Sequence, residues 1–247
     1  MGNLSFVFIL LALVAEIIGT IGGFGSSVFF VPMANFYFDF QSVLGITAVF
    51  HLSSNISKIF LFKQGLNVRL ILSIGLPSVV FVLLGGYLAK YIAPQFLEAF
   101  LAVFLVLFSV FFLIRKSDFI RPTLQNSFIG GAFSGFSAGL LGTGGAIRGL
   151  TMAAFNLEKS AFVATSAAID LMIDASRTVV YYKNGFIHGH DLKYVPLLLA
   201  VGFIGSFLGK KILTYIPQSG FRNLSLVLIL CIGAFTLVKL LWNVFGG

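Results

Sequence analysis

Residues 19–27 read GTIGGFGSS and lie inside a charge-free run that extends from residue 17 to residue 38. Each glycine in a helix interior costs about 1 kcal/mol relative to alanine and lets the backbone unwind. Residues 139–145 read GLLGTGG and lie inside a second charge-free run, from residue 122 to residue 147. The two clusters therefore predict helices that break within apolar surroundings.

The composition excludes a water-soluble fold. Apolar residues make up 58% of the 247 residues and charged residues only 10%, whereas a soluble domain carries about a quarter charged residues. Apolar runs of about 20 residues are long enough to cross a bilayer as helices, and they lack the period-two alternation of barrel strands. We expect an all-α, polytopic helical membrane protein with helices over 4–28, 42–62, 70–89, 96–114, 126–146, 160–182, 194–212 and 223–242.

The charged residues and the single cysteine limit the partners. The net charge of +8 is spread over short connectors, which is typical of cytoplasmic loops and not of a nucleic-acid surface. We therefore expect a lipid bilayer as solvent, no nucleic acid, and a multi-pass location in a cell membrane, specifically a bacterial inner membrane. Cys231 has no partner cysteine, and the HGHD run at residues 188–191 is more typical of a solvated loop, so we expect no metal and no cofactor.

The two ends of the chain add two expectations. No basic residue precedes Leu4, so the first apolar segment is expected to be a retained span and not a cleaved signal peptide. With four crossings in each half, the connectors on the N-terminal side would hold eight Lys or Arg residues against five on the other side, which favours cytoplasmic termini.

The chain also has the pattern of an internal duplication. At an offset of 119 residues, Lys58 falls on Arg177, and at an offset of 120 residues, Gly25 falls on Gly145 and Gly65 on Gly185. We expect two homologous transmembrane repeats with glycine-broken helices, over 1–114 and 123–247, joined by a loop at 115–122. Whether the repeats are parallel or inverted stays open. Such duplication is typical of transporters, whose substrate sites form between the repeats.

Two polar stripes occupy the second and sixth apolar segments. Their members are spaced i, i+4, i+8 and i+11, so each stripe lies on one side of a helix. Because a charge in lipid costs about 2.5 to 3.5 kcal/mol, the stripes must face the interior, either as a static ion-pair network or as a functional site. The stripes are Thr47, His51, Asn55 and Lys58 in the first half, and Ser166, Asp170, Asp174 and Arg177 in the second.

The glycine clusters carry a specific resemblance. Each is followed about twenty residues later by a small-x-Thr/Ser element, namely Gly45-Ile46-Thr47 and Val163-Ala164-Thr165-Ser166. This pattern, together with the stretch from Gly131 to Gly139, resembles the sulfite exporter TauE/SafE family of membrane permeases over nearly the whole chain. The resemblance implies a permease for small sulfur-containing or organic anions, such as sulfite or sulfonates.

The site residues follow from these patterns. A half-helix that begins after a break points N–H groups and a positive dipole end into the membrane, which suits an anion, and hydroxyls donate hydrogen bonds without adding charge. Proton coupling is expected from His51, Asp170 and Asp174, with Asp170 favoured because Arg177 would hold Asp174 ionised. Substrate binding is expected from Gly22, Gly23, Gly25, Ser26, Thr47, Gly142, Gly144, Gly145, Thr165, Ser166, Arg148, Lys58 and Arg177.

The sequence therefore predicts a transporter of small anions. The resemblance implies export, and proton coupling is our expectation from the buried carboxylates and His51. An anion channel stays open as the alternative, because a sequence does not show whether two gates alternate. We expect no enzymatic activity and allow for a homodimer. The identity of the anion, the coupling ion and the direction of flux are left open by the sequence.

Overall fold

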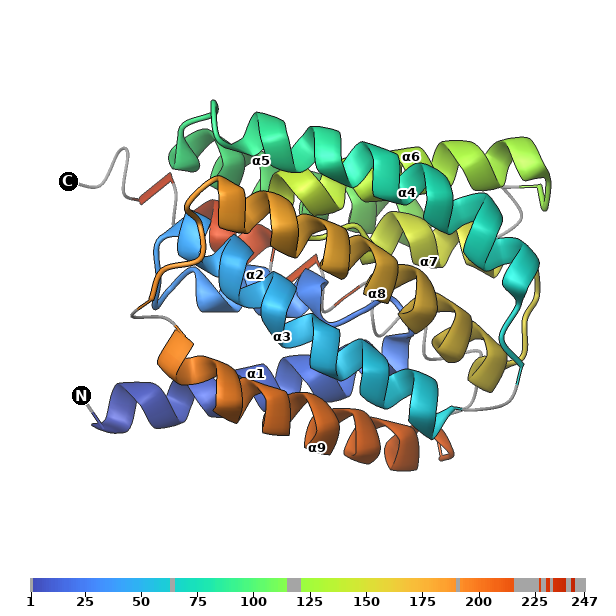
Figure 1. The fold of residues 1–247 in the computed structure, drawn as a ribbon, viewed down its shortest axis with the longest axis horizontal. Coiled ribbons are helices and arrows are strands. Elements are labelled where there is room, and N and C mark those ends of the chain that lie inside the picture. The colour runs from blue at the N-terminus through green and yellow to red at the C-terminus, as the bar shows by residue number, and fades with distance from the viewer. Residues whose placement is uncertain are drawn as a thin grey trace.

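The computed structural model describes residues 2–62, 65–114, 121–189 and 192–215, together with residues 227, 230–231, 233–238 and 241–242. Most of the expected linker 115–122 lies outside these residues, as do His190 and Asp191. The described part is helical with short connectors and contains no strand (Figure 1), so the expected all-α fold is confirmed. The elements are α1 (Gly2–Gly22), α2 (Ser27–Ala34), α3 (Phe40–Leu61), α4 (Val68–Ala89), α5 (Pro94–Ile114), α6 (Leu124–Leu141), α7 (Gly145–Ala153), α8 (Lys159–Lys183), a 3-10 turn η2 (Leu192–Tyr194) and α9 (Val195–Leu213).

Polar residues start three of the long helices. The side chains of Asp39, Asn67 and Thr123 accept hydrogen bonds from backbone N–H groups three residues further on, at the beginnings of α3, α4 and α6. Such caps satisfy donors that the first helical turn leaves without partners. The sequence patterns that precede these apolar runs therefore fix where the helices begin.

The first glycine cluster turns the chain back on itself. Gly23 and Gly25 have φ angles of +65° and +86°, a region that glycine adopts without strain. The ring of Phe8, early in α1, lies 5.8 Å from the ring of Phe30 in α2 and 5.0 Å from that of Phe38 beyond it. The two helices therefore form an antiparallel hairpin, and α2 returns toward the end at which α1 begins.

The second glycine cluster makes a matching hairpin from α6 and α7. Gly142 has a φ angle of +76° and ends α6. Ser134 of α6 donates a hydrogen bond of 2.9 Å to the carbonyl oxygen of Gly144, which precedes α7. A Cβ atom on Gly130 would overlap the side chain of Thr151, near the other end of α7. The breaks expected within 19–27 and 139–147 are thus confirmed, each as a tight turn of three or four residues.

The tips of the two hairpins meet inside the protein. A Cβ atom on Gly145 would overlap the carbonyl oxygen of Phe24, and one on Gly149 would overlap the Phe24 ring. Both positions are glycine because the backbone of one tip lies directly against the other. The break residues are mostly buried, so they lie in the interior and not at a membrane surface.

Helices α3 and α8 cross the centre side by side and run in opposite directions (Figure 1). The backbone N–H of Asn67, beyond the end of α3, donates to the hydroxyl of Thr165 near the start of α8, at 3.0 Å. At the other end, a Cβ atom on Gly45 of α3 would lie 2.5 Å from the carbonyl oxygen of Phe186, beyond the end of α8. The 119-residue offset makes α3 and α8 counterparts in the two halves, and the two helices run in opposite directions. Any repeat between the halves is therefore an inverted one. Homology of the halves stays a prediction.

The remaining helices surround this centre. Helix α1 packs along α9, and α6 packs along α4. The contact between α4 and α6 is close because Gly131, Gly135 and Gly139 face it, and a Cβ atom on any of them would overlap backbone of α4. Small residues at such spacing are how membrane helices approach one another.

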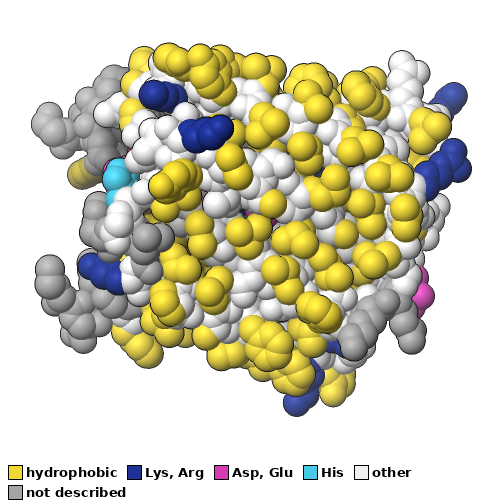
Figure 2. All heavy atoms as spheres, viewed as in Figure 1, with side chains coloured by type: hydrophobic (Ala, Val, Ile, Leu, Met, Phe, Trp, Pro, Cys, Tyr) yellow, Lys and Arg dark blue, Asp and Glu magenta, His cyan; other side chains and the backbone are white. Residues whose placement is uncertain are grey.

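The outer surface is suited to lipid. Among the described residues, four helices are long and apolar enough to cross a membrane: Phe40–Leu61, Val68–Ala89, Pro94–Phe111 and Val195–Leu213. Figure 2 shows hydrophobic side chains spread across one face of the protein, while most Lys and Arg side chains lie toward its left and right ends. The expected multi-pass membrane fold is therefore confirmed.

The grouping of connectors by four crossings in each half is wrong. Because α2 folds back along α1, α3 starts at the end where the chain begins, and the connector that follows α3 lies at the opposite end (Figure 1). The expected grouping had placed that connector, with Lys63, at the N-terminal end. The charge count that favoured cytoplasmic termini therefore no longer holds.

Candidate functional site

Among the described residues, three ion pairs lie in the interior beside the hairpin tips. Glu16 of α1 pairs with Lys58 of α3, with Nζ and Oε1 2.8 Å apart. Arg148 of α7 pairs with Asp170 of α8, and within α8 the Asp174 carboxylate lies 2.7 Å from Nε of Arg177. Except for Asp170, whose side chain is 16% exposed, all these side chains are buried. The expectation that the charged stripes face the interior is confirmed.

Glu16 is the most heavily hydrogen-bonded of the three carboxylates. Besides the Lys58 ammonium, it accepts hydrogen bonds from hydroxyl groups on α1, α3 and α9 and in the first hairpin tip. Each donor removes part of the cost of burying the charge. The donors are Thr20 at 3.2 Å, Ser26 at 2.5 Å, Ser54 at 2.6 Å and Ser206 at 2.9 Å.

Arg148 connects the second hairpin to the first. Its guanidinium donates to both carboxylate oxygens of Asp170, to the hydroxyl of Ser166 at 3.1 Å, and to the carbonyl oxygen of Phe24 at 3.2 Å. Ser166 in turn donates to the carbonyl oxygen of Gly23 at 2.7 Å. The carbonyls left open by the first break are therefore satisfied by side chains of α7 and α8.

Arg177 likewise donates a hydrogen bond to a carbonyl oxygen at the second break. Its Nη1 donates to the carbonyl oxygen of Gly142 at 2.6 Å, at the C-terminal end of α6, where carbonyls lack helical partners and the dipole is negative. Asp174, its carboxylate partner, also accepts from the side-chain amide of Asn55 in α3 at 2.7 Å. The Arg177 charge is therefore held by a carboxylate and a helix end together.

His51 bridges the two networks. Its Nε2 lies 2.9 Å from the Ser26 hydroxyl and its Nδ1 lies 3.4 Å from Nη2 of Arg177. Because Ser26 donates its proton to Glu16, its oxygen accepts from Nε2–H, and Nδ1 accepts from Arg177. A neutral imidazole with its proton on Nε2 satisfies both contacts. Glu16 and Arg177 are thus joined through Ser26 and His51.

A small cavity lies between the first hairpin tip, α3 and α8. Its volume is about 10 Å³, which is about the room for one water. An oxyanion with four heavy atoms does not fit until these elements move apart. The cavity is lined by Gly19, Gly23, Gly25, Asn55, Lys58, Val163, Ser166, Ala167 and Asp170.

The structure divides the expected site residues into three groups. Gly23, Gly25, Lys58, Ser166 and Asp170 line the cavity. A second group lies next to it in the hydrogen-bond networks and comprises Ser26, His51, Gly142, Arg148, Asp174 and Arg177. The rest do not line it and comprise Gly22, Thr47, Gly144, Gly145 and Thr165.

The residues of the third group have local roles. The Thr47 hydroxyl donates to the carbonyl oxygen of Val43 in its own helix, at 2.6 Å. The Thr165 hydroxyl accepts from the backbone of Asn67. A Cβ atom on Gly144 would overlap the carbonyl oxygen of Ser134, so this glycine permits the closeness of α6 and α7.

Glu16 is not among the site residues expected from the sequence. Its position one turn before the glycine cluster was the only signal in the sequence. The hydroxyls that surround it come from residues 20, 26, 54 and 206, and only residue 20, four positions further along α1, is placed there by helical spacing. Asn55 was placed in the polar stripe but not among the site residues, although it lines the cavity.

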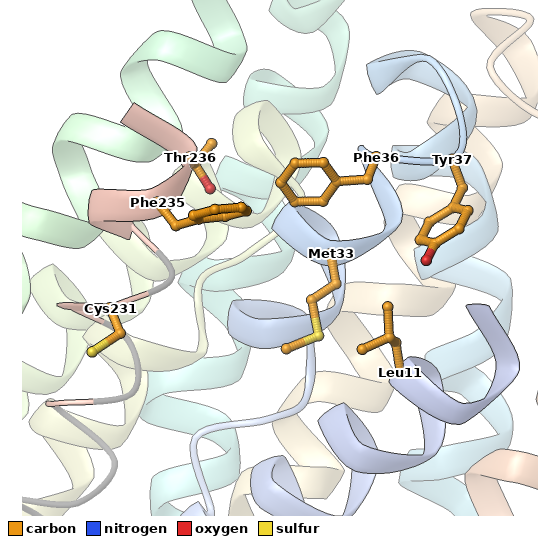
Figure 3. Close-up of a pocket in the computed structure, with 7 residues that line it drawn as sticks. All are labelled: Leu11, Met33, Phe36, Tyr37, Cys231, Phe235 and Thr236. Atoms are coloured by element: carbon orange, nitrogen blue, oxygen red, sulfur yellow. The ribbon is translucent and has the colours of Figure 1, made fainter. Parts of the chain in front are cut away.

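A larger cavity, of about 340 Å³, lies apart from the charged centre. Figure 3 shows Met33 and Phe36 on one side of it and Phe235 and Cys231 on the other. No charged side chain is among its described lining residues, which are Leu11, Met33, Phe36, Tyr37, Cys231, Phe235 and Thr236. Its chemistry suits an apolar occupant and not a small anion.

Comparisons with known proteins identify the family of the chain. Among curated proteins, no sequence matches the chain at a significant level. A protein-family model, described as sulfite exporter TauE/SafE, matches residues 8–236 and so includes both hairpins, α3, α8 and every charged residue of the interior. The chain therefore belongs to the sulfite exporter TauE/SafE family of membrane transporters.

Proposed function

We propose that this protein is a permease that exports small sulfur-containing or organic anions, such as sulfite or sulfonates, across a bacterial inner membrane. The observation that carries the proposal is the cavity beside the first hairpin tip, which is lined by Lys58, Asn55 and Ser166. Their ammonium, amide and hydroxyl groups bond to Glu16, Asp174 and the Gly23 carbonyl in the described conformation, and would have to be released to bind an anion. These are the donor types that an oxyanion accepts from. Membership of a family of sulfite exporter-type transporters supports the same substrate class.

The two broken helices favour a transporter over a channel. The cavity has room for about one water, so we infer that the described conformation is a closed state of the site. The anion would enter when the hairpin tips separate from α3 or α8 on one side and leave when they separate on the other. Broken helices between inverted halves are the elements that alternate access in many transporters.

Proton coupling is part of the proposal. Carboxylates inside membrane transporters commonly carry protons, and Asp170 is the one that lines the cavity. A proton on Asp170 would change the charge next to the bound anion. The direction of net transport would then depend on the combined gradients of the anion and the proton.

Flux of anions into proteoliposomes tests the proposal. Sulfite, sulfate, sulfoacetate and taurine are offered in turn, with and without an imposed pH gradient. We expect uptake of sulfite or of a sulfonate that a pH gradient accelerates. If the folded protein takes up none of these anions, the proposed substrate class is wrong. If the rate of uptake does not depend on the pH gradient, the channel is favoured.

One substitution locates the site. Ser166→Ala removes a hydroxyl that lines the cavity, while Ser109→Ala removes a buried hydroxyl of α5 that bonds only to Leu105 of its own helix. A hydrogen bond contributes about 0.5–1.5 kcal/mol net, so we expect Ser166→Ala to weaken sulfite affinity about 2- to 10-fold. The Ser109→Ala variant is the matched control and should keep the affinity of the parent protein.

A further inference from the structure

The charges in the interior balance. Among the described residues, three basic side chains lie there, Lys58, Arg148 and Arg177, and each is paired with one carboxylate. His51 adds no charge in the tautomer that its hydrogen bonds require. Every interior cation thus already has a counter-ion, and none is reserved for a substrate.

An anion that enters such a site brings an uncompensated charge. Burial of an unpaired charge between helices is strongly unfavourable. A cation therefore has to be released from its carboxylate when the anion binds, and the carboxylate has to lose its charge. The transfer of a proton to a carboxylate does both.

The three carboxylates differ in how tightly they are held. Glu16 has Lys58 and four hydroxyl donors, and Asp174 has Arg177 and an amide on a neighbouring helix. Asp170 has hydrogen bonds from Arg148 alone among the described contacts. It is also the most exposed of the three and the only one that lines the cavity.

Arg148 is positioned to hold what replaces Asp170. Its side chain is fully buried, and Ser166 and the Phe24 carbonyl keep the guanidinium in place independently of Asp170. A planar guanidinium donates two parallel hydrogen bonds, which suits a sulfonate or sulfite as well as a carboxylate. Gly25 leaves room beside the pair, because a Cβ atom there would lie 3.0 Å from the Asp170 carboxylate and 3.4 Å from Arg148.

We propose that a singly charged oxyanion and the Asp170 carboxylate compete for Arg148, and that one proton moves with each anion. The inference rests on the proposed function and specifies its coupling. A proton from the aqueous phase binds a carboxylate oxygen of Asp170, the neutral carboxyl leaves the guanidinium, and the anion takes its place. On release of the anion the proton departs and the ion pair forms again. Net charge stays constant, so transport is electroneutral and selects singly charged anions over doubly charged ones.

The decisive experiment uses methanesulfonate in proteoliposomes that contain the full-length protein. Its conjugate acid is strong, so any proton that accompanies it is carried by the protein and not by the anion. An internal pH dye reports proton movement, and potassium with valinomycin sets the membrane potential. We expect one proton per methanesulfonate, no response to the potential, and no uptake of sulfate.

The Asp170→Asn variant tests the residue. An amide of nearly the same shape leaves Arg148 without a counter-ion, so we expect methanesulfonate to bind more tightly than to the parent, with an affinity that no longer varies with pH. Its flux should respond to the membrane potential and move no protons. Glu158→Gln removes an exposed carboxylate outside the charged centre and is expected to behave like the parent.

The outcomes separate this inference from the proposed function. Uptake of sulfite together with electrogenic or proton-free movement of methanesulfonate, or with no movement of it, would overturn the exchange and leave the permease standing. If the Asp170→Asn variant still moves one proton with each methanesulfonate, as the parent is expected to do, the exchange is likewise overturned and the permease stands. Failure of the parent to move any anion would instead remove the proposed function. The charge measurement on the parent decides the matter even if the variant does not fold.

Discussion

At the scale of single residues, the interior is organised by how each charge is satisfied. Glu16 collects donors from four segments, Arg177 closes a helix end, and Arg148 closes a break. A static ion-pair network and a transport site both require such pairing. Asp170 is the residue that distinguishes a static network from a transport site, because among the described contacts it has one partner and it lines the cavity. Variants of Asp170 therefore test the two alternatives that the sequence left open.

Asp39, the N-cap of α3, carries a prediction about pH. Partial burial raises its pKa, but hydrogen bonds from the side chain and backbone of Ser42, with the charge of His188, lower the pKa by more, so that the net shift is downward. A carboxyl group whose pKa is lower in the folded protein stabilises the fold at pH values above its pKa in the unfolded chain, about 3.9. This stabilisation is lost as the pH falls through the pKa of the folded protein.

The test of this prediction is the thermal unfolding of Asp39→Asn in detergent at a series of pH values. Asparagine still caps the helix but carries no charge, so we expect the variant to be slightly less stable than the parent at neutral pH and equal to it in acid. Glu158→Gln is the control, because Glu158 precedes α8 without a side-chain capping bond. A gap between Asp39→Asn and the parent that stays constant down to acid pH would contradict the assignment.

At the scale of elements, glycine has two separate uses. In the hairpin tips, Gly23, Gly25 and Gly142 adopt positive φ angles that turn the chain. Along α6, glycines at every fourth position let α4 approach to backbone contact. The sequence could not separate these uses, since both appear as glycines within an apolar run.

The contact between α4 and α6 is tested by Gly135→Ala. The added Cβ would overlap the carbonyl oxygen of Ser78, so the helices must separate, and such overpacking typically costs about 1–3 kcal/mol. We expect a lower thermal unfolding midpoint in detergent. Gly189→Ala is the matched control, because a Cβ atom there meets nothing within 4 Å. Equal midpoints for the two variants would mean that α4 and α6 are not packed as described.

At the scale of the whole molecule, the hairpins reverse the expected orientation. The end opposite the start of α1 carries Arg69, Arg121, Lys159, Lys210 and Lys211, whereas the end at which α1 begins carries Lys90, Lys183 and Lys193 among the described residues. From these residues, the positive-inside rule predicts that the former end lies in the cytoplasm and the start of α1 outside.

Cysteine labelling of intact cells checks this orientation. In a Cys231→Ser background, Tyr91→Cys lies in the exposed connector between α4 and α5, and Glu158→Cys lies in the exposed connector before α8. A membrane-impermeant maleimide should label the Tyr91→Cys variant from outside and the Glu158→Cys variant only after lysis. The opposite labelling pattern would restore the orientation that the four-crossing count had favoured.

The sequence by itself determined the class of the fold and the position of the breaks. Charge-free runs of about 20 residues require helices in lipid, and the dense glycine clusters at 19–27 and 139–145 favour interruptions. The same local rules placed the polar stripes of α3 and α8 inside, because a charge facing lipid is too costly. These are properties of short windows, so no knowledge of the rest of the chain was needed.

Only the tertiary structure decided which charges pair and in which direction the halves run. Arg148 and Asp170 are 22 residues apart, and Glu16 and Ser206 are 190 residues apart, and such contacts depend on how hairpins and helices dock. The return of α2 along α1 likewise depends on packing such as that of Phe8 on Phe30, which a count of apolar runs does not contain. Local periodicity sets what each segment is, whereas burial of distant side chains against one another sets where it lies.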